Sequence, residues 1–555
     1  MSMMSTFGSF TMARLGIYAA QKGLSVTGNN IANINTVGYT RQTLDQISLR
    51  TNSSDRFQSR YDVQVGSGVL CVGVSQIRDP YLDIRYRSEM SSVGAMDAKL
   101  SGLNDLAAIL DEVGDGEDQN GLIEAQLSDL LAALQNLNVN VGQDGYDTQV
   151  RSSAEALVTL FHSAANKLQE VYNNTASRLD QDVDTINEIL RDIRDLNDSI
   201  RKSEIHGDSA LEQRDERNRK IDELSQYMKI DVIYTMEDIG AGQQVEKLTI
   251  KLGGANPDGT VTSDSSTLID GSYATQLSVN ADDNYNVTLS ELRDSEERDM
   301  EGSTAVLLDD NDLYGSLQST RELLTEAGEF ATQGTIDNVD ESAATKRGIP
   351  YYQKSLDLLA QKIAEVFNDA NNGKLSTGAD APNSGNLFSN SGDGDVATGI
   401  TAANISISKG WSSGTVQIVN SYVVPDGQTE PSSTDGSNIL HLIALMGTKM
   451  DYNPKVLVNN APDGPMFHGT FQEMLGNIGS VLGNDTRSTT TMLNTYYAAS
   501  VELDTSRTSV SGVDLNDEAV NMMQYQRSYS AACRLMTTLD EAIDKLINGT
   551  GVVGR

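Results

Sequence analysis

The chain has 555 residues, too many for one hydrophobic core, so we expect three or four domains. Its net charge of −37 argues against a nucleic-acid backbone or an anionic membrane as partner, because both attract basic surfaces. No run approaches eighteen apolar residues, so no membrane span is predicted. The two cysteines and four histidines form no CxxC motif and no Cys/His cluster, and we predict no metal and no other cofactor.

The first forty residues carry a heptad repeat without proline. Of the ten core positions read from Met3 and Thr6 at intervals of seven, eight are apolar and two are threonine. This pattern predicts a helix that packs on another helix with a left-handed twist and ends near residues 33–39. Its larger apolar core positions are Phe10, Ile17, Leu24 and Ile31.

The residues that follow predict a short β linker and then a series of helices. Alternating apolar residues between 61 and 74 predict short strands around Gly66-Ser67-Gly68. Residues 81–256 contain no proline, and their periodicity is largely helical. The expected helices lie at about 81–112, 120–138, 146–204 and 209–228.

Two insertions interrupt the helical pattern. Residues 229–308 contain β-rich runs separated by turn signals and predict an inserted β domain. Residues 376–436, rich in Gly, Ser, Asn and Asp, predict a smaller insertion with strands near 403–408 and 415–424. Because helical periodicity resumes after each, we expect both at one end of a helical trunk and the chain termini at the opposite end. The resumed helices are expected at 313–330, 351–371, 437–450 and 467–508.

The last forty residues mirror the first forty. From Leu515, nine of ten heptad core positions are apolar. Matched length and matched period favour pairing of the two terminal helices as a coiled coil. The alternative is two unrelated amphipathic helices that dock on a core. The apolar residues chosen for the contact are Leu515, Met522, Tyr529, Met536, Leu539, Ile543 and Leu546.

The predicted fold is therefore mainly α with inserted β domains. It combines terminal helices paired as a coiled coil, a long-helix trunk and peripheral β insertions. Residues 1–80 and 509–555 would form the terminal domain with its short β linker. The trunk would comprise residues 81–228, 309–375 and 437–508, and the insertions residues 229–308 and 376–436.

Two terminal motifs carry a family resemblance. Residues 28–41, GNNIANINTVGYTR, resemble the amino-terminal signature of the bacterial flagellar axial proteins of rod, hook and hook–filament junction. Residues 511–529, from SGVDLNDEA to QYQRSY, resemble the matching carboxyl end. The positions that the resemblance assigns to subunit packing are Asn30, Ala32, Asn33, Asn35, Thr36, Gly38, Tyr39, Arg41, Gln526, Arg527 and Tyr529.

Chain length and Tyr314-Gly315-Ser316-Leu317 before a helix are more similar to the junction member than to hook or rod members. The resemblance implies a non-enzymatic subunit that joins hook to filament. It also implies self-association into a ring, contacts with the hook protein and a second junction protein, and an export chaperone at the C-terminal helix. The amino terminus shows no Sec-type signal, which alone predicts a cytoplasmic protein. The resemblance instead implies export without a cleaved signal peptide through the flagellum's own type III channel, to an extracellular position.

Three alternative functions follow from parts of the sequence. A flagellar hook or rod protein is disfavoured by the helix-rich residues 81–228. A soluble coiled-coil adaptor or signalling protein explains the apolar seam at 158–200 but not the paired terminal motifs. A hydrolase rests on Ser412, because residues 410–414 match the G-x-S-x-G nucleophile motif, with His441 and His468 downstream.

Neither of the two site-like motifs supports its chemistry. The nucleophile motif needs a following helix, whereas residues 415–419 predict a strand, so we interpret Ser412 as part of a hairpin turn. Residues 309–312 begin like a calcium loop, but Leu313 and Tyr314 occupy the positions of a ligand and the glycine. We therefore predict a helix cap there and no catalytic or metal site.

Overall fold

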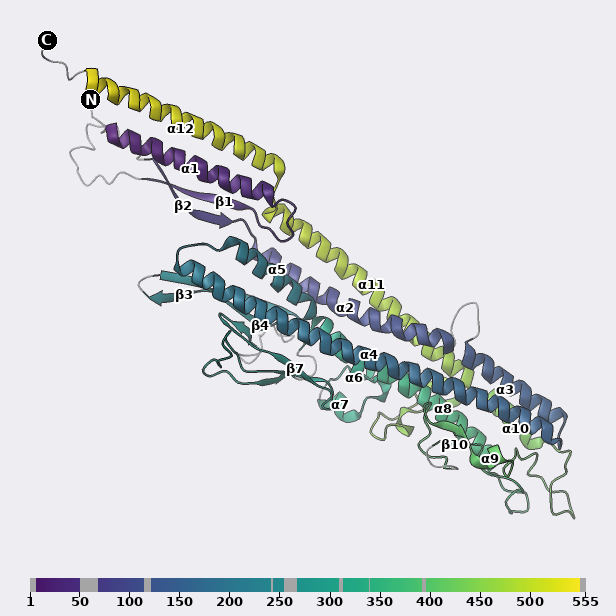
Figure 1. Cartoon of the computed structure of the whole chain (residues 1–555). Helices are drawn as coiled ribbons and strands as arrows, with labels where there is room; N and C mark the ends of the chain where they lie inside the picture. The colour runs from purple at the N-terminus through teal and green to yellow at the C-terminus, as the bar shows by residue number, and fades with distance from the viewer. Residues whose placement is uncertain are drawn as a thin grey trace, which may run out of the picture.

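The computed structural model describes residues 6–49, 68–113, 121–240, 243–253, 267–308, 313–338, 340–391 and 396–549. The molecule is elongated, with long helices running along its length and small β-sheets beside them (Figure 1). The first and the last described helices lie together at one tip, as predicted. Within the described ranges, no helix is both long and apolar enough to span a membrane.

The terminal helices form that tip. Helix α1 (Thr6–Ala32) lies beside α12 (Leu515–Gly549). An antiparallel hairpin of β1 (Gln42–Ser48) and β2 (Val69–Gln76) packs on α1. The predicted strand at 69–74 is present, and its partner is residues 42–48. The strand expected at 61–65 lies outside the described residues.

Most trunk helices occur where the periodicity predicts them, within a few residues. The helix predicted at 313–330 already ends at Thr325, and the short helix at 333–338 was not predicted. Thr470 begins α11 with a capping box, since its hydroxyl accepts a bond from the Glu473 N–H and the Glu473 carboxylate accepts one from the Thr470 N–H. The helices are α2 (Pro80–Val113), α3 (Leu122–Val139), α4 (Asp144–Ile205), α5 (Leu211–Tyr227), α6 (Gly315–Thr325), α7 (Gln333–Asn338), α8 (Ile349–Asn371), α10 (Ser437–Met446) and α11 (Phe471–Ser511).

The first insertion forms two antiparallel sheets. One has the order β3-β4-β5-β6, and the other β7-β8-β9. They lie along the C-terminal half of α4, the half nearer the terminal helices (Figure 1), so the prediction that both insertions sit at the far end of the trunk is wrong for this one. Asn187 of α4 holds β7 in place, since its amide bonds both the N–H and the C=O of Leu277, at 2.7 and 2.9 Å. The strands are β3 (Ile230–Gly240), β4 (Gln243–Leu252), β5 (Thr267–Asp270), β6 (Tyr273–Ala274), β7 (Leu277–Asn280), β8 (Asn286–Leu289) and β9 (Val306–Leu308).

The second insertion contains less strand than predicted. Its ladder joins β10 (Phe388–Asn390) to β11 (Ile405–Ile407), followed by the short helix α9 (Lys409–Ser413). Residues 415–424 form no strand. Side chains bond this backbone instead: the Asn371 amide accepts from the Val419 N–H at 2.8 Å and donates to the Gln417 C=O at 3.1 Å. A further short ladder, not predicted, joins β12 (Met450–Tyr452) to β13 (Phe467–Gly469).

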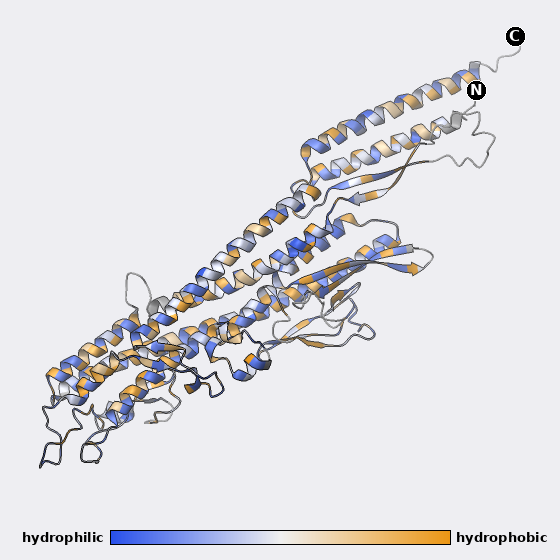
Figure 2. Cartoon of the chain, turned by 180° about the vertical axis from the view of Figure 1, so that it is seen from behind, coloured by the Kyte–Doolittle hydropathy of each residue, from blue (hydrophilic) through white to orange (hydrophobic). Residues whose placement is uncertain are grey.

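One hydrophobic cluster runs through the trunk and both insertions. Leu248 and Ile250 of β4 and Phe388 and Trp411 of the second insertion belong to it, together with Phe367 of α8. The Phe388 ring lies 5.7 Å from the Phe367 ring and 5.9 Å from the Trp411 ring. Orange, hydrophobic segments are frequent where the helices meet at the end away from the termini (Figure 2). The insertions are therefore not peripheral to the core, which corrects that part of the prediction.

Candidate subunit-packing site

The amino-terminal motif closes α1 onto the β hairpin through Asn30. This side chain is almost completely buried. Its amide accepts a hydrogen bond from the Gln42 N–H at 3.0 Å and donates one to the Gln42 C=O at 2.9 Å. The Tyr39 hydroxyl donates to the same Asn30 oxygen at 2.9 Å. The pKa of the Tyr39 phenol is raised, mainly by burial and then by the nearby carboxylates of Glu212 and Asp215. The hydroxyl therefore keeps its proton and remains a donor.

The next residues of the motif end the helix and turn the chain. The Asn33 amide donates to the Asn29 C=O at 3.0 Å, and the Thr36 hydroxyl donates to the Asn33 side chain at 3.2 Å. Gly38 has φ of +82°, a conformation that residues with a Cβ rarely adopt. Ala32 and Asn35 are exposed. The motif therefore ends α1 and turns the chain into β1.

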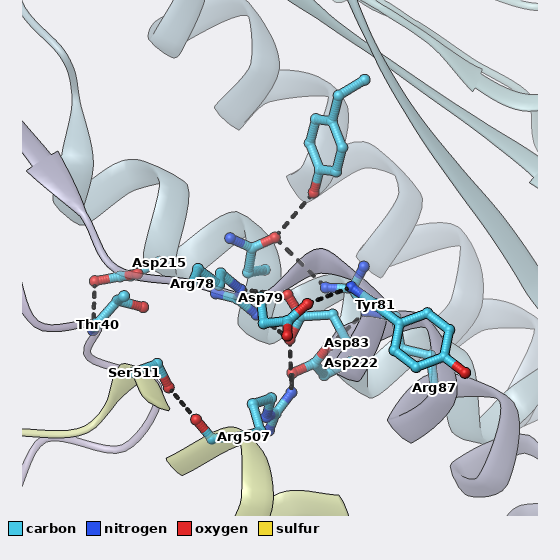
Figure 3. Close-up of polar contacts among 12 residues, drawn as sticks. Thr40, Arg78, Asp79, Tyr81, Asp83, Arg87, Asp215, Asp222, Arg507 and Ser511 are labelled. Carbon is cyan, nitrogen blue, oxygen red and sulfur yellow. Dashed lines mark hydrogen bonds and ion pairs between the residues drawn. The ribbon is translucent and has the colours of Figure 1, made fainter. Parts of the chain in front are cut away.

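Arg41 connects this turn to the C-terminal helices. Its N–H donates to the Ser511 C=O at the end of α11, at 2.8 Å. Its guanidinium donates to Glu518 of α12, also at 2.8 Å, and the Glu518 side chain is 2% exposed. Glu518 is the one polar residue of the C-terminal heptad stripe, and this ion pair explains its presence. The Thr40 N–H donates to Asp215 of α5 at 3.0 Å (Figure 3).

A cluster of charges centred on Asp222 of α5 lies beneath this turn (Figure 3). The Asp222 carboxylate accepts from Arg87 of α2 at 2.7 Å and from Arg507 of α11 at 2.6 Å. Burial alone would raise its pKa, but Arg87 and Arg507 outweigh that effect and hold the pKa below its usual value. The Arg507 guanidinium also stacks 4.0 Å from the centre of the Tyr86 ring. These residues bind three trunk helices together at the base of the terminal pair.

Residues 33–40, the start of α12 and the Asp222 cluster line one open groove of about 1070 Å³. Residues of both terminal motifs thus line the same groove, and their role in subunit packing stays a prediction. Sequence reasoning missed Asp215, Asp222, Arg87 and Arg507, because they come from helices far apart in the chain and no spacing links them. The one available signal was Glu518, the single polar residue among the C-terminal heptad positions, because a charged residue at such a position needs a partner.

Small residues of α1 face α12. Ala13, Ala20 and Thr27, three of the heptad core positions read from Thr6, are buried at intervals of seven, and Gly23 is buried between the last two. A Cβ added at Gly23 would lie 2.4 Å from the Tyr525 ring, so the helices approach closely there.

The larger apolar residues named for the contact lie beside or beyond this line, and their role stays a prediction. Phe10 is 37% exposed, and Ile17, Leu24 and Ile31 are half-buried. Leu515 and Leu546 are 53% and 62% exposed, and Gln526 and Arg527 are exposed. The remaining predicted residues of α12 are half-buried: Met522, Tyr529, Met536, Leu539 and Ile543.

Ser412 is not in a hairpin turn, which corrects that interpretation. It lies exposed on α9, between β11 and an irregular segment. His468 bonds Asp451 at 2.7 Å, and in the described part of the chain no hydrogen bond joins Ser412 to a histidine. Residues 309–312, where a helix cap was predicted, lie outside the described residues.

Comparisons with known proteins identify this architecture. Residues 110–388 match the family model of the flagellar hook-associated protein FlgK helical domain. Residues 506–549 match the flagellar basal body rod FlgEFG protein C-terminal model, and residues 13–40 the flagella basal body rod protein model. The terminal motifs and the trunk thus match three flagellar families in chain order.

Curated relatives cover nearly the whole chain. Flagellar hook-associated protein 1 of Bacillus subtilis is 27% identical, across 100% of both chains. Its namesake in Salmonella typhimurium is 23% identical, across 97% of this chain and 98% of that one. In fold, the flagellar hook junction protein FlgK from Burkholderia pseudomallei is similar with a TM-score of 0.52 and 13% identity, covering 77% of this chain and 100% of that one. The chain belongs to the FlgK family of flagellar hook-associated proteins, non-enzymatic structural components of the bacterial flagellum at the hook–filament junction.

Proposed function

We propose that copies of this chain associate into a ring between hook and filament, with α1 and α12 of each copy paired as a coiled coil towards the ring's axis. One observation supports this most directly. Among the described side chains of α12, a helix of 35 residues, only Glu518 is buried. A helix in water depends on tertiary packing for most of its stability. The terminal pair therefore needs further apolar cover, which neighbouring copies would supply.

The exposed side of α12 fits a second partner before assembly. Val520, Met523 and Leu535 are 57%, 50% and 43% exposed. An exposed apolar stripe on a helix is suited to a hydrophobic groove. We infer that an export chaperone holds this stripe until the chain leaves the cell, without a cleaved signal peptide, for its extracellular position. In the assembled state the ring would contact the hook protein on one side and a second junction protein on the other.

The Asp222 cluster and the Arg41–Glu518 ion pair would together hold the terminal pair at a set angle to the trunk. Arg507 near the end of α11 bonds Asp222, and Arg41 before β1 bonds Glu518 at the start of α12. Both ion pairs are largely shielded from water, so salt would weaken them little. Load applied to the terminal helices would thus pass to α2 and α5 rather than bend the loop at 512–514.

Electron microscopy of flagella from a strain lacking this chain tests the proposal. We expect hooks of normal length without filaments, and restored filaments when the gene is supplied again. Absence of hooks would instead indicate a hook or rod function. Filaments of normal number and length on the mutant hooks would contradict the junction role.

A further inference from the structure

The middle of α11 presents an uncharged surface on an otherwise acidic molecule. Residues 488–501 lie between Arg487 and Glu502 and contain no Asp, Glu, Lys or Arg, in a chain of which 21% is charged. Here α11 packs along α2. Thr489, Ser500 and Leu503 form the narrow buried side. The helix is drawn mainly in pale colours over this stretch, between the strongly hydrophilic and hydrophobic extremes (Figure 2).

Three threonine hydroxyls on this surface are already bonded. Thr490, Thr491 and Thr495 donate to the carbonyl oxygens four residues earlier in the same helix, at 2.8, 2.9 and 2.9 Å. These donors therefore need no outside partner, and burying them costs less than burying free hydroxyls. The methyl groups of these threonines remain available for apolar contacts with a partner.

Large apolar side chains stand beside these threonines. Met492, Tyr497 and Val501 are 49%, 60% and 48% exposed. Helical geometry places Tyr497 and Val501 on adjoining turns, because residues four apart are neighbours on a helix surface. The exposed part of 488–501 is thus an uncharged face of helix on which the three threonine hydroxyls are satisfied, and we call it the α11 face.

We propose that the α11 face is where a second copy of this chain packs against the trunk. The argument is electrostatic. Two copies each carry a net charge of −37 and repel wherever acidic surfaces meet. An uncharged face removes that repulsion, whereas a basic partner would gain more from an acidic face. The proposal rests on the ring proposed above and names the surface that neighbouring trunks use.

The arrangement of the trunk fits a side-by-side contact. Helix α11 lies at one edge of the trunk and the β3–β4 hairpin at the other edge (Figure 1). Within one copy, α2 and α4 lie between these two edges. A contact between one edge of a copy and a different surface of the next is heterologous, and such contacts close into rings or continue as helices.

Photo-crosslinking identifies the occupant. A benzoylphenylalanine at Tyr497 replaces one aromatic side chain with another, and isolated flagella carrying it are irradiated. We expect a crosslinked dimer of this chain, absent from the irradiated, purified monomer. A crosslink to a different protein, or no crosslink beyond the monomer control, would overturn the proposal.

A charge placed in the same face tests its importance. Thr495→Glu should reduce the number of filaments per cell by about tenfold or more, while export and the melting temperature of the monomer stay unchanged. Thr495→Val should behave as wild type, because the lost hydroxyl bonds only its own helix. The matched control is Thr159→Glu on α4, an exposed threonine with the same bond to its own helix, at 2.9 Å.

Normal filaments on the Thr495→Glu strain would overturn the assignment of this face. That result leaves the junction role intact provided that the deletion strain lacks filaments. Normal filaments on the deletion strain would contradict the junction role itself.

Discussion

The trunk and the terminal pair are both built from long helices but differ in how completely their apolar faces are covered. Helices α4 and α8 bury Phe161, Leu190 and Phe367 to 1% exposure or less. In α12 the apolar stripe is half-buried at best, and the buried side chain is Glu518. Similar apolar periodicity therefore accompanies fully buried side chains in the trunk and only half-buried side chains in the terminal pair. Substitutions in the trunk should consequently change the stability of the isolated chain, whereas substitutions in the terminal pair should mainly change incorporation into flagella.

The largest expected effect on the isolated chain comes from Trp411→Ala. Its indole is fully buried, and its removal leaves a cavity in the cluster shared by the second insertion and the trunk. We expect the free energy of unfolding of the trunk to fall by about 3–5 kcal/mol. Urea unfolding of the purified chain measures this. Trp411→Phe should cost much less, and a loss under about 1 kcal/mol for Trp411→Ala would show that the insertion is independent of the core.

Asp222→Asn should be the next most damaging change. It leaves the Arg87 guanidinium, 3% exposed, and Arg507 without their shared carboxylate, at a cost of about 3 kcal/mol. Because the pKa of Asp222 is lowered by folding, its contribution is present above the unfolded pKa of about 4 and is lost as the pH falls through the folded value. The difference between mutant and wild type should therefore shrink below about pH 4.

Urea midpoints measured at pH 7 and pH 3 test both statements. The control is Asp504→Asn, which removes a half-exposed carboxylate that also bonds Arg507. It should cost under about 1 kcal/mol. Equal losses for the two variants would refute the central role of Asp222.

Asn30→Ala should act locally, at the point where the two regions meet. It removes bonds to both backbone groups of Gln42 and leaves a buried N–H without its partner, at a cost of about 1–3 kcal/mol. Hydrogen exchange should quicken in α1 and β1 but not in α4. The matched variant is Asn35→Ala in the same motif, whose side chain is exposed and which should leave exchange unchanged.

A smaller effect is expected at the contact between α1 and α12. Gly28→Ala should stabilise α1 by up to about 1 kcal/mol, because nothing lies within 4 Å of the added Cβ. Gly23→Ala offers the same gain in helix propensity but presses on the Tyr525 ring, so it should stabilise less or destabilise. Exchange rates in α12 compare the two. An equal gain from both would show that the helices do not approach closely.

The smallest effect on the monomer should come from Leu539→Asp with Ile543→Asp. Both side chains are only half-buried in the single chain, so its melting temperature should hardly change. In the ring the same charges would be buried among apolar groups at several kcal/mol, and incorporation into flagella should be lost. Amides of α1 and α12 protected as strongly as those of α4 in the free monomer would show that the terminal pair is already complete.

Much of the architecture was predictable because it depends on local pattern. The absence of proline and the 3-4 spacing of apolar residues determined the trunk helices, and the heptads located both terminal helices. The GNNIANINTVGYTR motif correctly marked a special turn. Local bonding explains why: Asn30 needs only Gln42 and Tyr39, all within twelve residues.

Long-range contacts decided what the sequence could not predict. Residues 415–424 have a strand's composition, but the side chains of Asn371 and Asp147, rather than a neighbouring strand, bond their backbone. The heptads include Ala13, Ala20 and Thr27 on the small-residue line of α1, but the close approach of the Tyr525 ring to Gly23 follows only from how the two helices pack. The Asp222 cluster joins residues 135 and 285 positions apart. Such pairings depend on which surfaces pack together as the chain buries its apolar area. The periodicity within a single helix or strand does not predict them.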